Sequence, residues 1–271
     1  MSVQNIGIVG IGKIGMMISD CLAKYHGDDL TINISSRSKN STLKLRDEFS
    51  NIVIHEEIES LMLSSKIIFL SVPPQVGLQM FEKVTRLKSG PKYVVSALAG
   101  LNFDSISQTY TGPVTRFLPS ILSQVGHGVS LVAHNPSVSE QQKHELEELM
   151  APLGCFHETI ESEFRYLAGL TSSGPAVISI LLEHLLASNT EGSKTSNSES
   201  SKLLNYTVEG VIKLIREQKL SHSELQKLVA TPKGVTEAIL EELKVSLPVT
   251  FQKTKMAANH RRSSLINNPK K

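Results

Sequence analysis

The 271-residue chain contains no tryptophan and only two cysteines, Cys21 and Cys155. Two thiols so far apart in sequence match neither a disulfide framework nor a paired-thiol metal site, which favours a reducing, cytoplasmic location. No HExxH sequence occurs, and the nine histidines lack the spacing of metal ligands. A GxSxG nucleophile motif is also absent. The sequence therefore predicts no metal site, and any chemistry is expected to come from a cofactor.

The chain also lacks a large excess of positive or negative charge, and it lacks long apolar runs. The formal net charge is only +2, which offers no electrostatic reason to expect nucleic acid. No signal-peptide pattern is seen at the start, and no apolar run approaches the roughly 20 residues that cross a bilayer. We expect a soluble protein without a nucleic-acid or membrane partner. Its length suits one large or two modest domains.

Short apolar runs alternate with amphipathic stretches from residue 4 to about 160. This alternation predicts an α/β domain with a parallel, doubly wound sheet of the Rossmann type. The expected strands are IGIV, TINIS, IIFLSV, YVVSAL, VTRFL and VSLVA, and the expected helices are 13–25, 75–87 and 139–151. Later residues show helical patterns only. We therefore expect a dinucleotide-binding domain over 1–160 and an all-α domain over 161–271.

A polar, serine-rich stretch interrupts the second region between Asn189 and Lys202. Its composition predicts either a flexible loop or the capped start of the next helix.

The sequence GIVGIGKIG carries three glycines in a GxGxxG spacing, between an apolar strand and an amphipathic helix. Gly10 permits a tight turn, Gly12 lets the backbone approach a pyrophosphate, and Gly15 lets helix and strand pack closely. The alternative is a glycine-containing turn of an unrelated α/β fold. The context favours a dinucleotide site that includes Lys13 and Ile14 at the helix start.

The end of the next strand distinguishes between dinucleotides. An NAD site usually has Asp or Glu here, about 20 residues further on, to bind the ribose hydroxyls. This chain has instead serine hydroxyls and two cations, Arg37 and Lys39, which suit the 2′-phosphate of NADP. The alternative is a solvated basic loop. The residues of this predicted phosphate site are Ser35, Ser36, Arg37 and Ser38.

Three further segments have weaker signals. Val72, Pro73 and Pro74 end an apolar strand where open sheets bind ligands, although a plain strand-terminating turn fits equally well. The sequences TSSGPA and TPKGVT each form the entrance to a helix. By themselves these entrances indicate capping, but two of them together suit a small carboxylate.

Six motifs in order resemble the pyrroline-5-carboxylate reductase family along nearly the whole chain. They are GIVGIGKIG, SVPP, VSALAGL, TRFLPS, TSSGPA and TPKGVTEAILEEL. The resemblance implies an NADP(H)-dependent enzyme that reduces 1-pyrroline-5-carboxylate to L-proline. It also implies a homodimer, or a higher homo-oligomer, with interlocked helical domains.

The resemblance further assigns roles to residues. It implies that the backbone at Gly234, Val235 and Thr236 binds the carboxylate of a cyclic imino acid, while the Thr236 hydroxyl hydrogen-bonds the ring nitrogen. Ser173 and Gly174 are expected to complete the substrate site, and Ala97 and Gly100 the cofactor site. At four positions near this site the chain departs from the family pattern: Pro73 replaces Lys, Ser120 replaces Asn, Lys233 replaces Gly and Val235 replaces Thr.

Three alternatives remain at this stage. The first is reduction of another small cyclic imino acid on the same scaffold. The second is a catalytically weak paralogue that binds NADP(H) and acts in regulation. The third is a deazaflavin-dependent NADP oxidoreductase, which shares the SSR segment but is not expected to carry both SSGPA and GVT.

Overall fold

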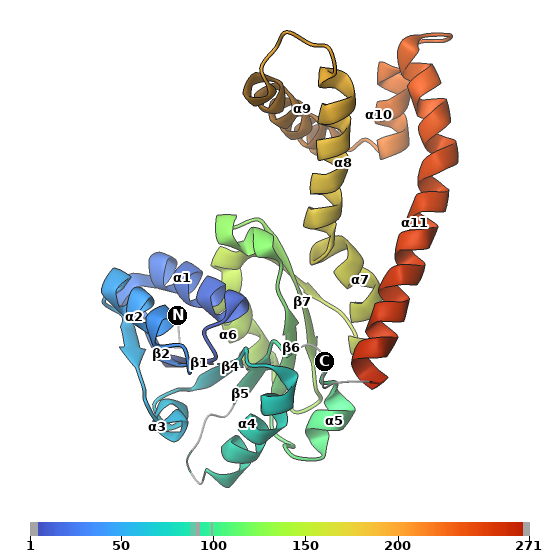
Figure 1. Cartoon of the computed structure of the whole chain (residues 1–271). Helices are drawn as coiled ribbons and strands as arrows, with labels where there is room; N and C mark the ends of the chain where they lie inside the picture. The colour runs from blue at the N-terminus through green and yellow to red at the C-terminus, as the bar shows by residue number, and fades with distance from the viewer. Residues whose placement is uncertain (1–4, 88, 90–92, 99, 268–271) are drawn as a thin grey trace. The chain divides into compact units, whose positions relative to one another are not determined.

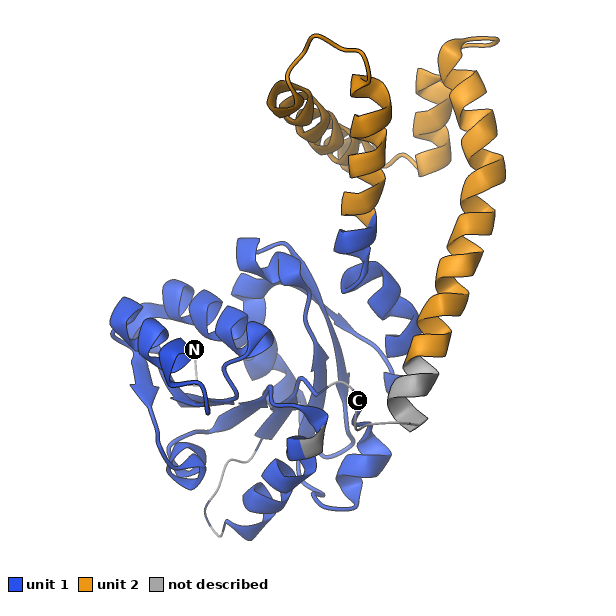
Figure 2. Ribbon diagram, in the orientation of Figure 1, with its two compact units in different colours: residues 1–177 blue, residues 178–271 orange. Residues whose placement is uncertain are grey.

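The computed structural model describes residues 5–87, 89, 93–98 and 100–267. It divides into two compact units, residues 1–177 and residues 178–271 (Figure 2). The boundary between the units lies inside a helix, α8 (Gly174–Thr190). The division at residue 160 that the sequence suggests remains a prediction.

Unit 1 is built on an eight-stranded sheet in the order β3-β2-β1-β4-β5-β6-β7-β8 (Figure 1). All neighbouring strands run parallel except β6 and β7. The strands are β1 (Asn5–Val9), β2 (Thr31–Ser35), β3 (Ile52–Ile54), β4 (Ile67–Leu70), β5 (Tyr93–Ser96), β6 (Val114–Leu118), β7 (Gly128–His134) and β8 (Gly154–Glu158). The expected fold class is confirmed, with one antiparallel pair as a difference.

The reversal at β7 follows from the length of its connection. A parallel crossover needs a dozen or more residues, usually a helix. Between β6 and β7 the described chain has only a short 3-10 turn, Ile121–Val125. The strand therefore returns beside β6 in the opposite direction.

Helices cover both faces of the sheet because residues that alternate along the strands are apolar on both faces. Ile6, Ile8 and Phe69 belong to the larger core with α1 (Lys13–His26) and α6 (Glu140–Met150). Ile68 and Leu70 face the other way, toward α3 (Ile58–Leu63), α4 (Pro74–Arg86) and α5 (Phe103–Ser107). The remaining helices of unit 1 are α2 (Lys39–Glu48) and α7 (Phe164–Thr171), with short 3-10 turns at Gly27–Asp29, Ala151–Leu153 and Glu161–Glu163.

The described part of unit 2 contains helices and the loops that join them, and no strand. It contains most of α8, then α9 (Asn197–Gln218), α10 (His222–Val229) and α11 (Val235–Asn267). The serine-rich stretch is partly loop and partly helix. The Ser196 hydroxyl accepts a hydrogen bond from the Glu199 amide at 3.2 Å and caps α9, so both expectations for this stretch hold over part of its length.

The segment Glu161–Thr190 is long and apolar enough, by length and composition, to cross a membrane. The sequence analysis did not anticipate it, because no single apolar run is that long and the helix is interrupted at Ser172 and Ser173. The apolar side chains on α8 are open to solvent in the single chain: Ile178, Ile180 and Leu185 are 55%, 52% and 50% exposed.

Candidate functional site

A cavity of about 510 Å³ lies at the carboxyl ends of strands β1 to β4 in unit 1. Open α/β sheets bind ligands at this edge, beside helix N-termini. Eight predicted cofactor residues line the cavity: Gly10, Gly12, Ser35, Ser36, Arg37, Ser38, Val72 and Pro73. The fold thus brings together segments that are more than 60 residues apart in sequence.

The glycine turn after β1 is shaped by close backbone contacts. Gly10 has a φ of +94°, which favours glycine, and a Cβ there would lie 2.8 Å from the Ser71 carbonyl oxygen. The Ser71 hydroxyl donates to the Gly10 carbonyl at 2.6 Å. A Cβ on Gly15 would overlap the Gly10 carbonyl oxygen and lie 2.7 Å from Ser71 Oγ. The turn and the helix are therefore packed against each other at Gly15.

Gly12 differs from both of these glycines. No heavy atom lies within 4 Å of a Cβ built on Gly12, and its φ of −83° suits any residue. The fold itself therefore does not require glycine at this position. Within the described residues the amides of Lys13 and Ile14 have no acceptor, as is usual at a helix N-terminus. Open space beside free amides and a helix dipole suits a pyrophosphate.

Arg37 lies at the rim of the cavity, after β2. Its side chain is exposed and makes no ion pair or hydrogen bond within the described part of the chain. The neighbouring serines form a local network, in which the Ser36 hydroxyl accepts from the Ser38 amide at 3.3 Å and the Ser38 hydroxyl lies 3.0 Å from Ser41 Oγ. A free guanidinium among hydroxyls fits a phosphate ester.

Sequence reasoning missed several residues of the cavity. Glu56 follows β3 and adds an exposed carboxylate to the lining, and an apolar side is formed by Ile58, Val76 and Met80. The signal for Glu56 was its place after the short apolar run IVI, which is too short to stand out as a strand. Three predicted cofactor residues outside the glycine turn, Pro74, Ala97 and Gly100, do not line the cavity. Pro74 begins α4, and Ala97 and Gly100 follow β5.

The two predicted substrate segments belong to different units and are described separately. In unit 1, Ser173 precedes α8 and its carbonyl accepts from the amides of Ala176 and Val177 at 3.1 and 3.2 Å. Gly174 is buried. The Ser172 hydroxyl donates to the Pro119 carbonyl at 3.3 Å, which fixes this helix entrance to the segment after β6.

In unit 2, Thr231 to Gly234 form a β-turn in front of α11. The Gly234 amide donates to the Thr231 carbonyl at 2.9 Å. Lys233 occupies the third turn position with a φ of +60°, and proline before it restricts the turn to type II. Glycine is the usual residue there, because a side chain in the left-handed region is strained. Lys233 is thus a departure that the backbone tolerates at a cost.

A carboxylate, and not a threonine, binds the turn in front of α11. Glu237 Oε2 accepts from the Lys233 amide at 2.5 Å. Among the described residues, the hydroxyls of Thr231 and Thr236 and the amides of Val235 and Thr236 have no hydrogen-bond partner. These groups are therefore available to a ligand, whereas the Gly234 amide is already engaged within the turn.

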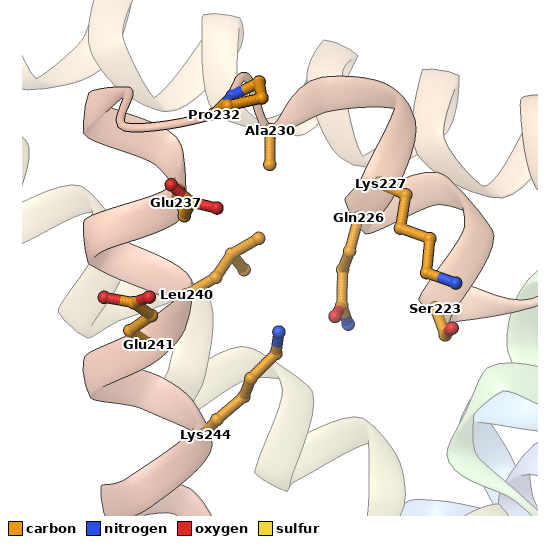
Figure 3. A pocket seen from close by; sticks show the side chains of 9 residues that line it. All are labelled: Ser223, Gln226, Lys227, Ala230, Pro232, Glu237, Leu240, Glu241 and Lys244. Carbon is orange, nitrogen blue, oxygen red and sulfur yellow. The ribbon is translucent and has the colours of Figure 1, made fainter.

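A groove of about 370 Å³ runs between α10 and α11 beside this turn (Figure 3). Leu240 and Lys244 of α11 face Gln226 of α10 across it, and Ala230 and Pro232 lie at one end. Thr236 and Val235 do not line it. The groove and the free donors are therefore separate features of unit 2.

The strain at Lys233 leads to a stability prediction. We expect Lys233→Gly to raise the free energy of unfolding by about 0.5 to 1 kcal/mol, because relief of a left-handed side chain exceeds the entropy cost of glycine. Lys219, at the end of α9 with a φ of +51°, should respond in the same way. Lys227→Gly, inside α10, is the control and should lower stability by about 1 kcal/mol. Thermal melts measure all three, and a lower melting temperature for Lys233→Gly would contradict the strain argument.

Two family models match the chain, and together they cover most of it. "NADP oxidoreductase coenzyme F420-dependent" matches residues 5–100, and "Pyrroline-5-carboxylate reductase dimerisation" matches residues 161–265. The dimerisation match begins at Glu161, where the apolar segment Glu161–Thr190 also begins. This coincidence indicates that the segment is the apolar core of a protein interface.

Individual relatives extend over both units. "Pyrroline-5-carboxylate reductase 3" of Bacillus subtilis is 26% identical over 92% of each chain. "ComE operon protein 4" of the same organism is 24% identical over 86% of each chain. A crystal structure of a Plasmodium falciparum pyrroline carboxylate reductase with NADP bound superposes with a TM-score of 0.82, at 19% identity, over 98% of each chain.

Proposed function

The chain is a distant member of the pyrroline-5-carboxylate reductase family, an NADP oxidoreductase family, and we propose that it reduces 1-pyrroline-5-carboxylate to L-proline with NADPH. The observation that carries this proposal is a set of three groups at the start of α11 that have no partner among the described residues: the amides of Val235 and Thr236 and the Thr236 hydroxyl. The proposal includes a homo-oligomer, which the match to a dimerisation region supports. A cytoplasmic location remains part of the proposal.

The cofactor cavity supports NADP(H) through its own residues. Gly12 leaves room for a pyrophosphate, the start of α1 offers free amides, and Arg37 has no partner within the described chain. These are the groups that a dinucleotide with a 2′-phosphate needs. When bound, reduced nicotinamide supplies the hydride.

Because the nicotinamide supplies the hydride, the protein's own residues are needed to bind and orient the imine. A protonated cyclic imine is already electrophilic at carbon, and hydride addition converts it to the amine without a further proton. We propose that the amides of Val235 and Thr236 hold the substrate carboxylate at the positive end of α11. The Thr236 hydroxyl oxygen then accepts a hydrogen bond from the protonated ring nitrogen. Ser173 and Gly174 of unit 1 remain predicted substrate residues. Positioning and exclusion of water provide most of the catalysis.

A test of this proposal replaces Thr236 by valine. Loss of one hydrogen bond to the substrate should reduce kcat/KM for 1-pyrroline-5-carboxylate by roughly fivefold to a hundredfold, about 1 to 3 kcal/mol. NADPH affinity and melting temperature should stay unchanged, because the hydroxyl has no partner within the described chain. Steady-state oxidation of NADPH measures kcat/KM. Titration measures NADPH affinity, and thermal melts measure the melting temperature.

Thr250→Val is the matched control. Thr250 lies further along α11, where its hydroxyl donates to the Ser246 carbonyl at 3.1 Å. We expect it to leave turnover unchanged. If Thr236→Val turns over normally but melts earlier, the threonine is structural and its assigned role is wrong.

A second candidate function is a regulatory protein that binds NADP(H) with little turnover. It is favoured by the similarity to "ComE operon protein 4", whose name states no reductase activity, and by the strained Lys233 beside the proposed substrate groups. Reduction of another small cyclic imino acid is the closer enzymatic alternative. Absence of imine reduction by the wild type, together with NADPH binding, would favour the regulatory function.

A further inference from the structure

A carboxylate and a guanidinium line the cofactor cavity together without forming an ion pair. Arg37 and Glu56 are the only charged residues among the described residues that line it. Both side chains are exposed, and neither makes a hydrogen bond or an ion pair within the described part of the chain. Because neither group is engaged, a ligand of this cavity meets both an available cation and an available anion.

Backbone pairing places Glu56 beside the predicted phosphate site. Strands β2 and β3 run parallel, with Ile34 opposite Ile54. The pairing continues one residue further, where the His55 amide donates to the Ile34 carbonyl at 2.9 Å. Glu56 follows Ile54 by two residues, as Ser36 follows Ile34. The carboxylate therefore starts from the strand end next to the serines and Arg37.

The side chain of His55 fixes this strand end. Its Nε2 lies 2.8 Å from Asn33 Oδ1 on β2, and its Nδ1 lies 3.0 Å from Ser60 Oγ on α3. The Asn33 side-chain nitrogen donates to the Ile6 carbonyl of β1 at 3.2 Å. The Asn33 oxygen is therefore the acceptor, and His55 Nε2 carries the hydrogen. The base of Glu56 is thus held on β2 and α3, while its carboxylate stays free in the cavity.

The turns after β1, β2 and β3 lie side by side at this edge. The Gly10 amide donates to the Ser35 carbonyl at 2.8 Å, which joins the first two turns. In the strand order, β2 lies between β1 and β3. A dinucleotide whose pyrophosphate binds at Gly12 therefore directs its adenosine ribose toward the turns after β2 and β3, because the ribose is bonded directly to the pyrophosphate.

The chemistry of the two charges suits two different riboses. A carboxylate only accepts hydrogen bonds, so its ligand group must be a donor. The 2′- and 3′-hydroxyls of the NADH adenosine are such donors, and an NAD site usually binds them with Asp or Glu. The 2′-phosphate of NADPH is an anion that Arg attracts and a carboxylate repels. Here the carboxylate comes from the end of β3 and not from the end of β2.

We propose that Glu56 is a cofactor-specificity residue, which binds the adenosine ribose hydroxyls of NADH and disfavours the 2′-phosphate of NADPH. The chain then accepts either cofactor, and Arg37 and Glu56 act in opposite directions on the preference. This inference rests on the proposed dinucleotide cofactor and deepens it. It does not depend on which imine is reduced.

The test replaces Glu56 by alanine and compares the two cofactors. We expect NADH to bind about tenfold more weakly than to the wild type, because a charged acceptor is lost. NADPH should bind about twofold to threefold more tightly, because an exposed like charge beside the 2′-phosphate is removed. Titrations of the full-length protein with both cofactors provide the measurement. Opposite signs are the informative result, since a merely structural role would weaken both.

Glu57→Ala is the matched control. It removes the same charge from the next residue, which does not line the cavity and whose side chain makes no capping hydrogen bond. Both affinities should stay at the wild-type values. A second variant, Glu56→Gln, keeps an oxygen acceptor but not the charge. It should tighten NADPH binding as alanine does and weaken NADH binding less.

Three results would overturn the inference: unchanged affinities in Glu56→Ala, equal losses for both cofactors, or a wild type that binds NADPH but not NADH. Equal losses would assign the carboxylate to the adenine ring, which the two cofactors share. Wild type that binds neither dinucleotide would contradict the proposed cofactor, and this inference with it. Dinucleotide binding without imine reduction would contradict only the proposed reaction, and the comparison of affinities would still decide the role of Glu56.

Discussion

Replacing Gly12 by valine is expected to remove NADPH binding almost completely and to leave the fold intact. The position has an extended backbone that valine adopts, and no protein atom lies within 4 Å of the added Cβ. A side chain would occupy the space between the α1 amides and the pyrophosphate, where close backbone approach is needed. We expect a loss of about a hundredfold or more in affinity, roughly 3 kcal/mol.

Gly15→Ala is the comparison that separates fold from binding. Its Cβ would overlap the Gly10 carbonyl oxygen, so we expect a loss of about 1 to 3 kcal/mol in the free energy of unfolding. Titration with NADPH and thermal melts on both variants measure the contrast. Normal NADPH binding by Gly12→Val would contradict the proposed pyrophosphate site. A lower melting temperature of Gly12→Val would show that the fold requires glycine at this position.

Arg37→Ala is expected to weaken NADPH binding by roughly tenfold to a hundredfold and to leave NADH binding nearly unchanged. A hydrogen bond to a charged group contributes about 1.5 to 3 kcal/mol. Because the guanidinium has no partner in the described protein, its removal breaks no internal contact and should not change the melting temperature. The measurement is titration of both cofactors against wild type and variant.

Lys39→Ala provides the control for net charge. Lys39 is the first residue of α2, two positions beyond Arg37, and does not line the cavity. Loss of an exposed charge at that position should change NADPH affinity only slightly. Equal losses of NADH and NADPH affinity in Arg37→Ala would contradict a 2′-phosphate site. Equal losses of NADPH affinity in Arg37→Ala and Lys39→Ala would contradict it as well.

The predicted phosphate site, Ser35 to Ser38, illustrates why the proposed cofactor site was largely predictable. Gly10 to Gly15 lie where β1 leads into α1, and Ser35 to Ser38 lie where β2 leads into α2, so their predicted roles follow from local backbone rules. Parallel strands bring their carboxyl ends to one edge whatever the intervening sequence is. The cavity that joins these segments required only that β1 and β2 be neighbours, as the register of Gly7 with Asn33 shows.

The substrate segments were less predictable. The motif TPKGVT placed a helix start correctly, yet the sequence did not indicate that Glu237 binds the Lys233 amide or that Lys233 is left-handed. A threonine at a helix entrance favours capping by propensity. The turn geometry decided otherwise, because a type II turn directs the Lys233 amide toward the first turn of α11 and leaves the Thr236 hydroxyl free.

The sequence by itself determined the class of the fold and the family that it resembles, and it predicted the cofactor, because glycine spacing, strand periodicity and helix patterns act over a few neighbouring residues. Only the tertiary structure decided the reversal of β7, the arrival of Glu56 at the cofactor cavity and the contact of Glu161 with both Arg116 and Phe103. The Glu161 contacts join groups 45 and 58 residues apart. Hydrogen bonds and burial at such separations depend on how whole elements pack, and no local pattern records them.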